Sequence, residues 1–387
     1  MVKLHIFNPE NDLALADGSA NYRAPQFAER IAYDLATLPL WFAPQGDAVL
    51  LPGEVHHDFY KKISSLFRLA MPYDMSQAAL LTGAVPWGWS AQVKRRLKQL
   101  GIEEHLLPTD GRVEAIRMLS SRISSIKILE CLKEMGVHTP PLPSYFTDFP
   151  SVADYICRRE RCVVKAPWSG SGKGILWGIG RVEPPMENFC KGIIKRQGGV
   201  ICEEFHDIRL EFAMEFLAAD GKVSFAGYSL FNTEKGGYTG NYLATDKEIE
   251  ELLSQNIPVA QIWNVKSSLT TVLGRMVAEA GYEGYLGVDM MIYKSGGEVL
   301  LNPCMELNLR MNMGMVSRTF YDRYVVEGKH GRYFVEFHKE KGKALEAHIA
   351  KEQEYSLELQ NGRIARGYCN LNPVTENSNY IAYAIIE

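Results

Sequence analysis

The sequence lacks the features that define several common classes of protein. Its seven cysteines are scattered and form no Cys-x-x-Cys pair, so zinc-ribbon spacing is absent and reduced thiols are expected. No apolar run reaches the roughly 18 residues of a membrane-spanning helix. The apolar start of the chain becomes polar at Asn8, too early for the core of a signal peptide. We therefore expect a cytoplasmic protein that has no membrane partner.

A strong excess of either charge is also missing. The chain has 42 lysines and arginines against 46 aspartates and glutamates, a net charge of −4. Because proteins that bind nucleic acid usually carry a basic patch or stripe, no nucleic-acid partner is expected. Internal repeats and low-complexity linkers are absent too. A length of 387 residues corresponds to two or three domains at roughly 100–200 residues each.

The order of apolar and polar segments predicts an α+β fold with mixed sheets. An apolar strand over residues 4–7 leads into a polar turn over residues 8–12, an order typical of an open α/β sheet. Apolar spacing predicts a helix over residues 116–135, ended by Gly136. From residue 200 onward, short apolar runs predict several strands.

The most distinctive local feature is a glycine-rich segment within residues 162–177, with glycines at 170, 172 and 174. It does not fit the Walker A motif, because Pro167 and Gly174 stand where that motif requires a glycine and a serine or threonine. It does not fit the dinucleotide-binding motif either, because Ile175 replaces the third glycine. Both motifs lead into a helix, whereas the apolar flanks here predict a loop between two strands.

A glycine-rich hairpin is a different device for binding phosphate. Its backbone amides can close over phosphate groups, because glycine lets the backbone approach them closely. Lys165, at the end of the entering strand, can supply a positive charge to a phosphate. A flexible surface hairpin with incidental lysines is the alternative interpretation.

Acidic residues follow in the next strands. Glu203, Glu204 and Phe205 end one apolar strand, and Glu211 follows seven residues after Glu204. An acidic strand end and its backbone can bind adenine through hydrogen bonds, and a carboxylate further along can hold ribose hydroxyls. An exposed, charged strand edge is the alternative.

A third group of polar residues lies near residue 300. Asp289 interrupts an apolar strand, and Glu306 and Asn308 alternate with leucines, so they face the same side as Arg310. Carboxylate and amide oxygens are hard ligands that suit Mg²⁺ bound to phosphate. In the alternative interpretation, Arg310 pairs with the acids in a purely structural ion pair.

Together these segments resemble the ATP-grasp superfamily, which includes D-alanine ligase, glutathione synthetase and biotin carboxylase. The resemblance covers residues 116–320 and rests on the order and spacing of the motifs. It implies an ATP-grasp fold preceded by an N-terminal open α/β domain over residues 1–115. It further implies a small lid subdomain over residues 116–200 and a C-terminal subdomain with the nucleotide and metal site over residues 201–387.

The resemblance also implies roles for individual residues. The residues expected to bind ATP are Lys127, Lys165, Ser169, Gly170, Ser171, Gly172, Lys173, Gly174, Glu203, Glu204, Phe205 and Glu211. Mg²⁺, or Mn²⁺, would bind Asp289, Glu306 and Asn308. In catalysis Lys165 would neutralise phosphate charge, and Arg310 would hold the γ-phosphate or the developing acyl phosphate. Arg122 is the alternative to Lys127 as a second phosphate-binding base.

Two features differ from the family pattern. The interval from Asp289 to Glu306 is longer than in D-alanine ligases, so Asn302 is an alternative metal ligand. The residues that select the substrate are not recognisable. Asn8, Asn11 or Asp12 could help to bind it, although asparagine and aspartate are also common in turns and helix caps.

The resemblance implies an ADP-forming ligase that joins a small-molecule carboxylate to an amine through an acyl phosphate. Two alternatives use the same nucleotide site. One is a kinase that phosphorylates a small molecule, and the other is a nucleotide-binding protein without turnover. The sequence does not identify either substrate, and the chain could form a homodimer.

Overall fold

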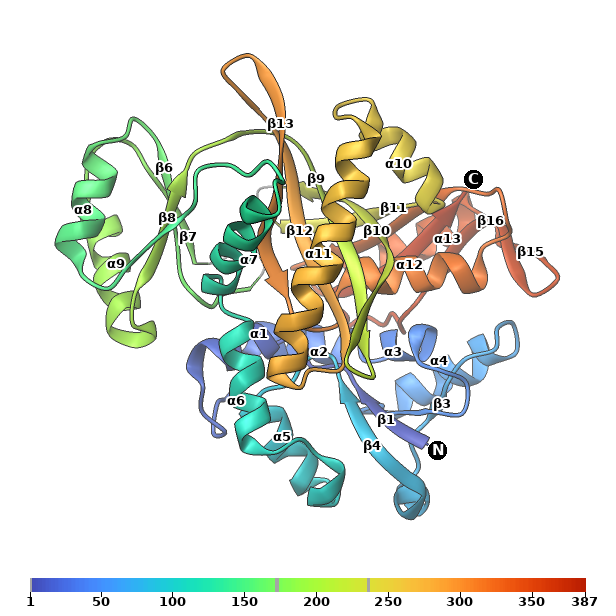
Figure 1. Cartoon of the computed structure of the whole chain (residues 1–387). Helices are drawn as coiled ribbons and strands as arrows, with labels where there is room; N and C mark the ends of the chain where they lie inside the picture. Colours follow the sequence, from blue (N-terminus) through green and yellow to red (C-terminus); the bar gives the residue numbers. More distant parts are fainter. Residues whose placement is uncertain (1, 171–173, 235–236) are drawn as a thin grey trace.

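A computed structural model describes residues 2–170, 174–234 and 237–387 (Figure 1). Its strands form a parallel sheet near the N-terminus, a small antiparallel sheet in the middle of the chain, and a long antiparallel sheet that continues to the C-terminus. The helices, together with the parallel and antiparallel sheets, confirm the predicted α+β class. Among the helices of these described ranges, none combines the length and the apolar composition of a membrane span.

The N-terminal sheet has the strand order β3-β2-β1-β4, with all neighbours parallel. Its elements are β1 (Val2–Ile6), α1 (Asn11–Asp17), α2 (Gln26–Asp34), α3 (Leu38–Phe42), β2 (Ala48–Val49), α4 (Glu54–Ser64), β3 (Met71–Pro72), the 3₁₀ helix η1 (Met75–Leu80), β4 (Leu81–Pro86), α5 (Ala91–Gln99) and the 3₁₀ helix η2 (Glu104–Leu106). The predicted strand and polar turn near Asn8 are confirmed. In a parallel sheet the carboxyl ends of the strands share one edge, so this turn lies beside the segment that follows β4.

The middle of the chain forms the sheet β5-β8-β6-β7, with α8 and α9 packed against it. Its elements are β5 (Ser144–Phe146), α8 (Phe149–Cys157), β6 (Cys162–Lys165), β7 (Ile175–Gly178), α9 (Pro184–Gln197) and β8 (Val200–Glu204). Strands β6 and β7 pair antiparallel, which confirms that the glycine-rich segment connects two strands. The free thiols Cys162, Cys190 and Cys202 are buried in this core as small apolar groups.

The predicted single helix over residues 116–135 is wrong. Two helices, α6 (Asp110–Leu119) and α7 (Ile123–Glu134), are separated by a break at residues 120–122. The backbone N–H of Arg122 donates to the carbonyl oxygen of Pro167 at 2.9 Å, outside any helix. This contact with a distant segment offsets the local helical preference and directs Arg122 toward the glycine-rich loop.

The long sheet has the order β13-β12-β9-β10-β11-β14-β17-β16-β15. Its elements are β9 (Asp207–Ala219), β10 (Lys222–Glu234), β11 (Gly237–Leu243), α10 (Asp246–Ser254), α11 (Val259–Ala280), β12 (Gly284–Ser295), β13 (Glu298–Asn308), α12 (Met313–Tyr324), β14 (Gly331–Phe337), α13 (Lys343–Glu354), β15 (Glu358–Gln360), β16 (Arg363–Asn370) and β17 (Tyr380–Ile386). Helices α7 and α11 pack on β9, β12 and β13 and bury the apolar side chains of these strands (Figure 1).

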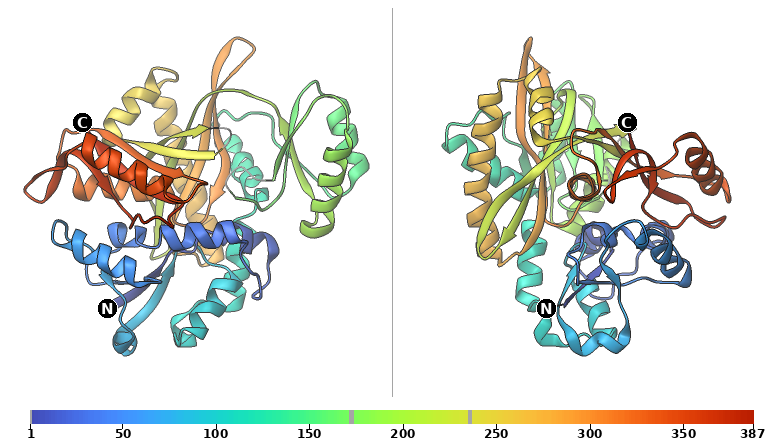
Figure 2. Two further views of the ribbon diagram at one scale, coloured as in Figure 1. Left: turned by 180° about the vertical axis from the view of Figure 1, so that it is seen from behind. Right: turned by 90° about the vertical axis from the view of Figure 1, so that its right-hand side faces the viewer.

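One hydrophobic core joins the beginning of the chain to its end. Phe7, Leu35 and Trp41 pack in the same cluster as Phe320 and Ala384. Figure 2 shows the blue N-terminal region directly beside the red C-terminal region in both views. The division at residues 115 and 200 stays a prediction, and its second boundary falls at the start of β8.

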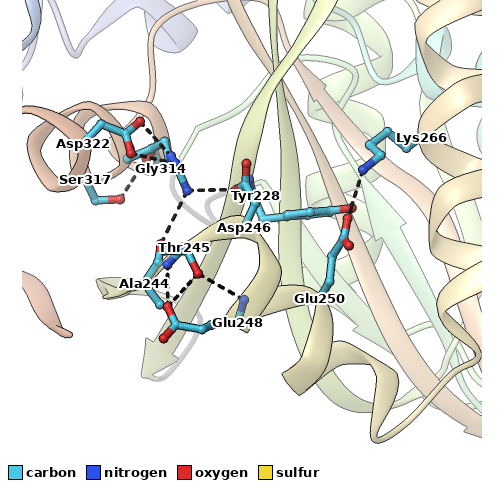
Figure 3. A network of polar contacts seen from close by, with 11 residues as sticks. Tyr228, Ala244, Thr245, Asp246, Glu248, Glu250, Lys266, Gly314, Ser317 and Asp322 are labelled. Atoms are coloured by element: carbon cyan, nitrogen blue, oxygen red, sulfur yellow. Dashed lines mark hydrogen bonds and ion pairs between the residues drawn. The ribbon is translucent and has the colours of Figure 1, made fainter. Parts of the chain in front are cut away.

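A polar network ties helices α10, α11 and α12 to strand β10 (Figure 3). Glu250 on α10 accepts hydrogen bonds from the Tyr228 hydroxyl at 2.6 Å and from the Lys266 ammonium at 2.9 Å. Arg318 on α12 donates to Asp246 at 2.9 Å. These bonds fix α12, which begins just after Arg310.

Removal of the Glu250 carboxylate is expected to destabilise this region. Glu250→Ala leaves the Tyr228 hydroxyl and the Trp263 indole N–H, which donates to Glu250 at 3.0 Å, without their acceptor. The free energy of unfolding should fall by about 1–3 kcal/mol. Glu251→Ala is the matched control on the same helix, because Glu251 is exposed and should change the stability by less than about 0.5 kcal/mol. Equal effects in urea denaturation would contradict a role for the network.

Candidate functional site

The base of the glycine-rich loop is a closed turn. The N–H of Ala166 donates to the carbonyl oxygen of Gly174 at 2.9 Å. Gly174 has φ +76°, and a Cβ atom there would lie 2.7 Å from the Cβ atom of Ser169, so only glycine fits. Ser171, Gly172 and Lys173, which are expected to bind phosphate, lie outside the described residues.

Arg122 connects this loop base to strand β13. Its Nη1 donates to the carbonyl oxygen of Ala166 at 2.8 Å and to the Ser169 hydroxyl at 2.6 Å. Its Nη2 lies 2.9 Å from Oε2 of Glu306. The Arg122 side chain is buried, whereas Lys127, five residues further along, is exposed on α7. The geometry favours Arg122 over Lys127 as the base that lies within the site.

Lys165 and Glu203 come from different predicted motifs and form an ion pair. Lys165 ends β6, and the antiparallel register with β8 places Glu203 opposite Val163, two residues earlier. Both side chains are largely buried, with 8% and 16% of their surfaces exposed. A buried lysine and glutamate stabilise each other's charge, and loss of either leaves the other uncompensated.

The residues expected to bind adenosine lie between the end of β8 and the first half of β9. Phe205 lies between β8 and β9, and the guanidinium of Arg161 stacks on its ring, with Cζ 3.4 Å from the ring centre. Glu211, on β9, accepts a hydrogen bond from the Thr233 hydroxyl at 2.9 Å. Glu204 is half-buried at the end of β8. Sequence reasoning did not anticipate Arg161, because no local pattern marks which arginine reaches the ring.

The predicted metal ligands lie together on β12 and β13. The register places Asp289 directly opposite Glu306, and Nδ2 of Asn308 donates to Oδ2 of Asp289 at 2.9 Å. Burial and the nearby charge of Glu306 raise the pKa of Asp289 to about 7. Two carboxylates that repel each other in a partly dry site are an arrangement that a divalent cation would stabilise.

The donor set matches magnesium better than a transition metal. Within the described ranges, no group of three or more His, Cys, Asp or Glu side chains could hold a metal ion. The predicted set contains two carboxylates and one amide, so phosphate oxygens and water would complete an octahedral Mg²⁺. Asn302, the alternative ligand, is buried, and its side-chain oxygen already accepts the N–H of Cys304 at 3.1 Å. The register places Asn302 opposite Met291 and Glu306 opposite Asp289, so it favours Glu306 over Asn302.

Arg310 makes a two-point ion pair with Asp12 across the site. Nε and Nη2 of Arg310 donate to the two carboxylate oxygens of Asp12, each at 2.7 Å. Nη2 also donates to Oδ1 of Asn308 at 3.1 Å. Asn308 therefore links Arg310 to Asp289, and the N-terminal helix α1 contributes a side chain to the predicted catalytic region.

The other two candidates from the N-terminal turn, Asn8 and Asn11, contact Gly88, and Asn11 also lines a cavity together with Asp12 and Arg310. Nδ2 of Asn8 donates to the carbonyl oxygen of Gly88 at 2.9 Å. Asn11 is also buried and packs against Gly88. These contacts hold the turn on the N-terminal sheet and agree with the turn alternative for Asn8 and Asn11, whereas Asp12 reaches Arg310.

Sequence reasoning missed Glu215, a carboxyl group buried in strand β9 with 1% of its surface exposed. Burial raises its pKa to about 8, although a 2.7 Å hydrogen bond from Asn312 opposes this shift. Asn312 caps α12 by accepting the N–H of Met315 at 2.8 Å. A signal was present, because an acid inside an apolar run is the same pattern that identified Asp289.

A cavity lies where these elements meet. It is lined by residues of α1, the glycine-loop base and β13, among them Asp12, Trp168, Ser169, Asn308 and Arg310. The cavity therefore lies between the predicted phosphate-binding loop and the predicted metal ligands.

Comparison with protein-family models and with curated protein sequences found no match. Solved structures do match. An ADP complex of purK, N5-carboxyaminoimidazole ribonucleotide synthetase, aligns with 100% of this chain and 93% of its own, at 14% identity and a TM-score of 0.50. A biotin carboxylase–β-γ-ATP complex from Campylobacter jejuni aligns with 100% of this chain and 88% of its own, at 11% identity and a TM-score of 0.51. Both are ATP-grasp enzymes, so this chain has the ATP-grasp fold that the resemblance predicted.

Replacement of Asp289 by asparagine is expected to stabilise the ligand-free protein at alkaline pH. The pKa of Asp289 is about 7 in the folded protein and roughly 3.9 in an unfolded chain. The fold therefore penalises the charged form at pH 8, and the penalty shrinks as the pH falls toward 4 and the carboxyl is protonated. Asp289→Asn should raise the free energy of unfolding at pH 8 by on the order of 1 kcal/mol or more.

The measurement is urea denaturation at pH 8 and pH 5 without nucleotide or metal. Asp207→Asn, at an exposed position at the start of β9, is the control, and its free energy of unfolding should show no increase that depends on pH. A gain for Asp289→Asn that is equal at both pH values would contradict the raised pKa.

Proposed function

We propose that this chain is an ADP-forming ligase that uses Mg-ATP to join a small-molecule carboxylate to an amine. The observation that carries the proposal is the convergence of the glycine-loop base, the facing acids of β12 and β13, and two guanidinium groups. This set of charges suits a nucleoside triphosphate and a second anion. The ADP in the purK structure supports the same use of the fold.

The nucleotide is assigned to the region where the base of the glycine-rich loop meets β12 and β13. Lys165 would neutralise phosphate charge, and the backbone amides of residues 169–174 would bind phosphate oxygens. Glu203, Glu204 and Phe205 would contact adenine, and Glu211 would hold the ribose. Arg122 is placed better than Lys127 to act as a second base, because it already contacts Ser169.

Asp289, Glu306 and Asn308 fit Mg²⁺, or Mn²⁺, because they offer hard oxygen donors from adjacent strands. The raised pKa of Asp289 indicates a carboxyl group that lacks sufficient counter-charge. The bound ion would offset negative charge on the phosphates during transfer. Arg122 partly neutralises the negative charge of Glu306 and holds that carboxylate in place.

The proposed reaction has two steps. A carboxylate oxygen of the substrate attacks the γ-phosphorus of ATP, the bond to the β–γ bridging oxygen breaks, and ADP leaves. The amine nitrogen then attacks the acyl carbon, inorganic phosphate leaves, and the amine gives up a proton. The chain contributes charge neutralisation and orientation, with Lys165 at the phosphates and Arg310 at the oxygens of the transferring group.

Binding of Mg-ATP is expected to depend on these residues. Lys165→Ala removes the phosphate counter-charge, and the double variant Asp289→Ala/Glu306→Ala removes the metal ligands. Each should weaken Mg-ATP binding tenfold or more, since loss of a charge-assisted contact costs about 1.5–3 kcal/mol. Lys195→Ala, at an exposed position on α9, is the control and should bind like wild type. Isothermal titration calorimetry measures the affinities, and a wild type that binds no nucleotide would refute the proposal.

Trapping of the intermediate separates a ligase from the alternatives. With Mg-ATP, a mixture of carboxylic acids and hydroxylamine, a ligase forms a hydroxamate because hydroxylamine attacks the acyl phosphate. We expect hydroxamate and ADP in equal amounts with wild type, and at least a hundredfold less with Arg310→Gln. ADP with a phosphorylated alcohol and no hydroxamate would identify a kinase, and binding without ADP would identify a protein without turnover.

A further inference from the structure

The charged end of Arg310 is already occupied by another part of the chain. Asp12 takes the Nε and Nη2 donors as a planar carboxylate, with both bonds at 2.7 Å. Nη2 also serves Asn308, and Nη1 donates to the carbonyl oxygen of Met311 at 3.2 Å. The pair of parallel donors that suits a carboxylate or phosphate is therefore in use before any ligand binds.

The pair is enclosed but within reach of solutes. The side chains of Arg310 and Asp12 keep 18% and 21% of their surfaces exposed, and both line the cavity beside Ser169. Asp12 also touches the glycine-rich loop, because a Cβ atom on Gly170 would lie 2.9 Å from its Oδ2. An incoming anion at Arg310 would lie against the Asp12 carboxylate and repel it.

The backbone around Asp12 is held in place. Asn8 and Asn11 fix the turn on Gly88, and the core that contains Phe7 and Phe320 joins this region to the long sheet. Movement of the whole N-terminal sheet would break that core. Among the described residues, the hydrogen bonds that rotation of the Asp12 side chain would break are those to Arg310.

We infer that Asp12 is a built-in occupant of an anion subsite on Arg310, which a planar or tetrahedral oxyanion of the ligand takes over during the reaction. The inference rests on the proposed function, and it specifies Arg310 as the place where the second anion of that reaction binds. The oxyanion has two sources, the γ-phosphate of the nucleotide and the carboxylate of the substrate. Asp12 rotates away when either one binds, and it holds Arg310 in a productive position until then.

The first experiment tests the phosphate source. Calorimetry compares the affinities of the Mg complexes of ADP and of adenylyl imidodiphosphate, which differ by the γ-phosphate. Asp12→Asn keeps the size of the side chain but frees Arg310 from its competing charge, so it should raise the preference for the γ-phosphate tenfold or more. Asp17→Asn, on the same helix, is the control and should leave the preference unchanged, and Asp12→Asn/Arg310→Gln should lose the gain.

The second experiment tests the carboxylate source and needs no nucleotide. Asp12→Gly leaves a space the size of acetate beside Arg310, so sodium acetate should raise its unfolding temperature by several degrees relative to sodium chloride at the same ionic strength. Wild type should show a smaller shift in the same direction, because acetate must displace Asp12 from Arg310, whereas Asp12→Gly/Arg310→Gln should respond equally to the two salts. Circular dichroism during heating measures this shift.

The two experiments together decide the inference. A raised preference for the γ-phosphate assigns the subsite to phosphate, and a raised unfolding temperature in acetate assigns it to carboxylate. Both results together show that phosphate and carboxylate share it. If neither experiment shows a gain, Asp12 is a permanent partner of Arg310 and the inference is overturned. If neither wild type nor Asp12→Asn binds nucleotide, the proposed function fails, and the acetate experiment alone then decides whether the subsite exists.

Discussion

The geometry of the candidate site depends on one buried guanidinium group. Arg122 binds the carbonyl oxygen of Ala166, the Ser169 hydroxyl and the Glu306 carboxylate at once. It therefore fixes the distance between the glycine-rich loop and the acidic strand β13. Arg122 lies in the break between α6 and α7, where its backbone N–H also binds the carbonyl oxygen of Pro167. A phosphate-binding loop and a metal site must hold one nucleotide together, so their separation has to be set by a rigid contact.

The site concentrates charge that the fold does not fully compensate. Asp289 and Glu215 are acids inside apolar strands, and burial raises the pKa of both above the usual range of carboxyl groups. Such groups lower the stability of the empty protein. A ligand that supplied positive charge or hydrogen bonds would offset this cost, which is the usual conflict between stability and activity.

The sequence predicted the local elements of the site well and their contacts poorly. The strands around the glycine loop follow from apolar, β-branched flanks, and the side shared by Glu306 and Asn308 follows from strand periodicity. Nothing local indicates that Arg122 interrupts a helix to reach Pro167, because that bond depends on tertiary packing. The pair of Asp12 with Arg310 joins residues 298 positions apart, a separation that no periodicity can reveal.

The shared core has a consequence for how the chain folds. Phe7 and Trp41 complete their packing against Phe320 and Ala384, which are synthesised much later. The part of the N-terminal region around Phe7 and Trp41 therefore completes its core only after these later segments are made, whereas Leu4, Ile6, Val93 and Leu97 pack in a second core formed within residues 4–107. Long-range contacts of this kind slow folding and leave apolar surface exposed in the meantime. In a nascent chain, the apolar surface around Phe7 and Trp41 thus stays accessible to chaperones until the segments that contain Phe320 and Ala384 are made.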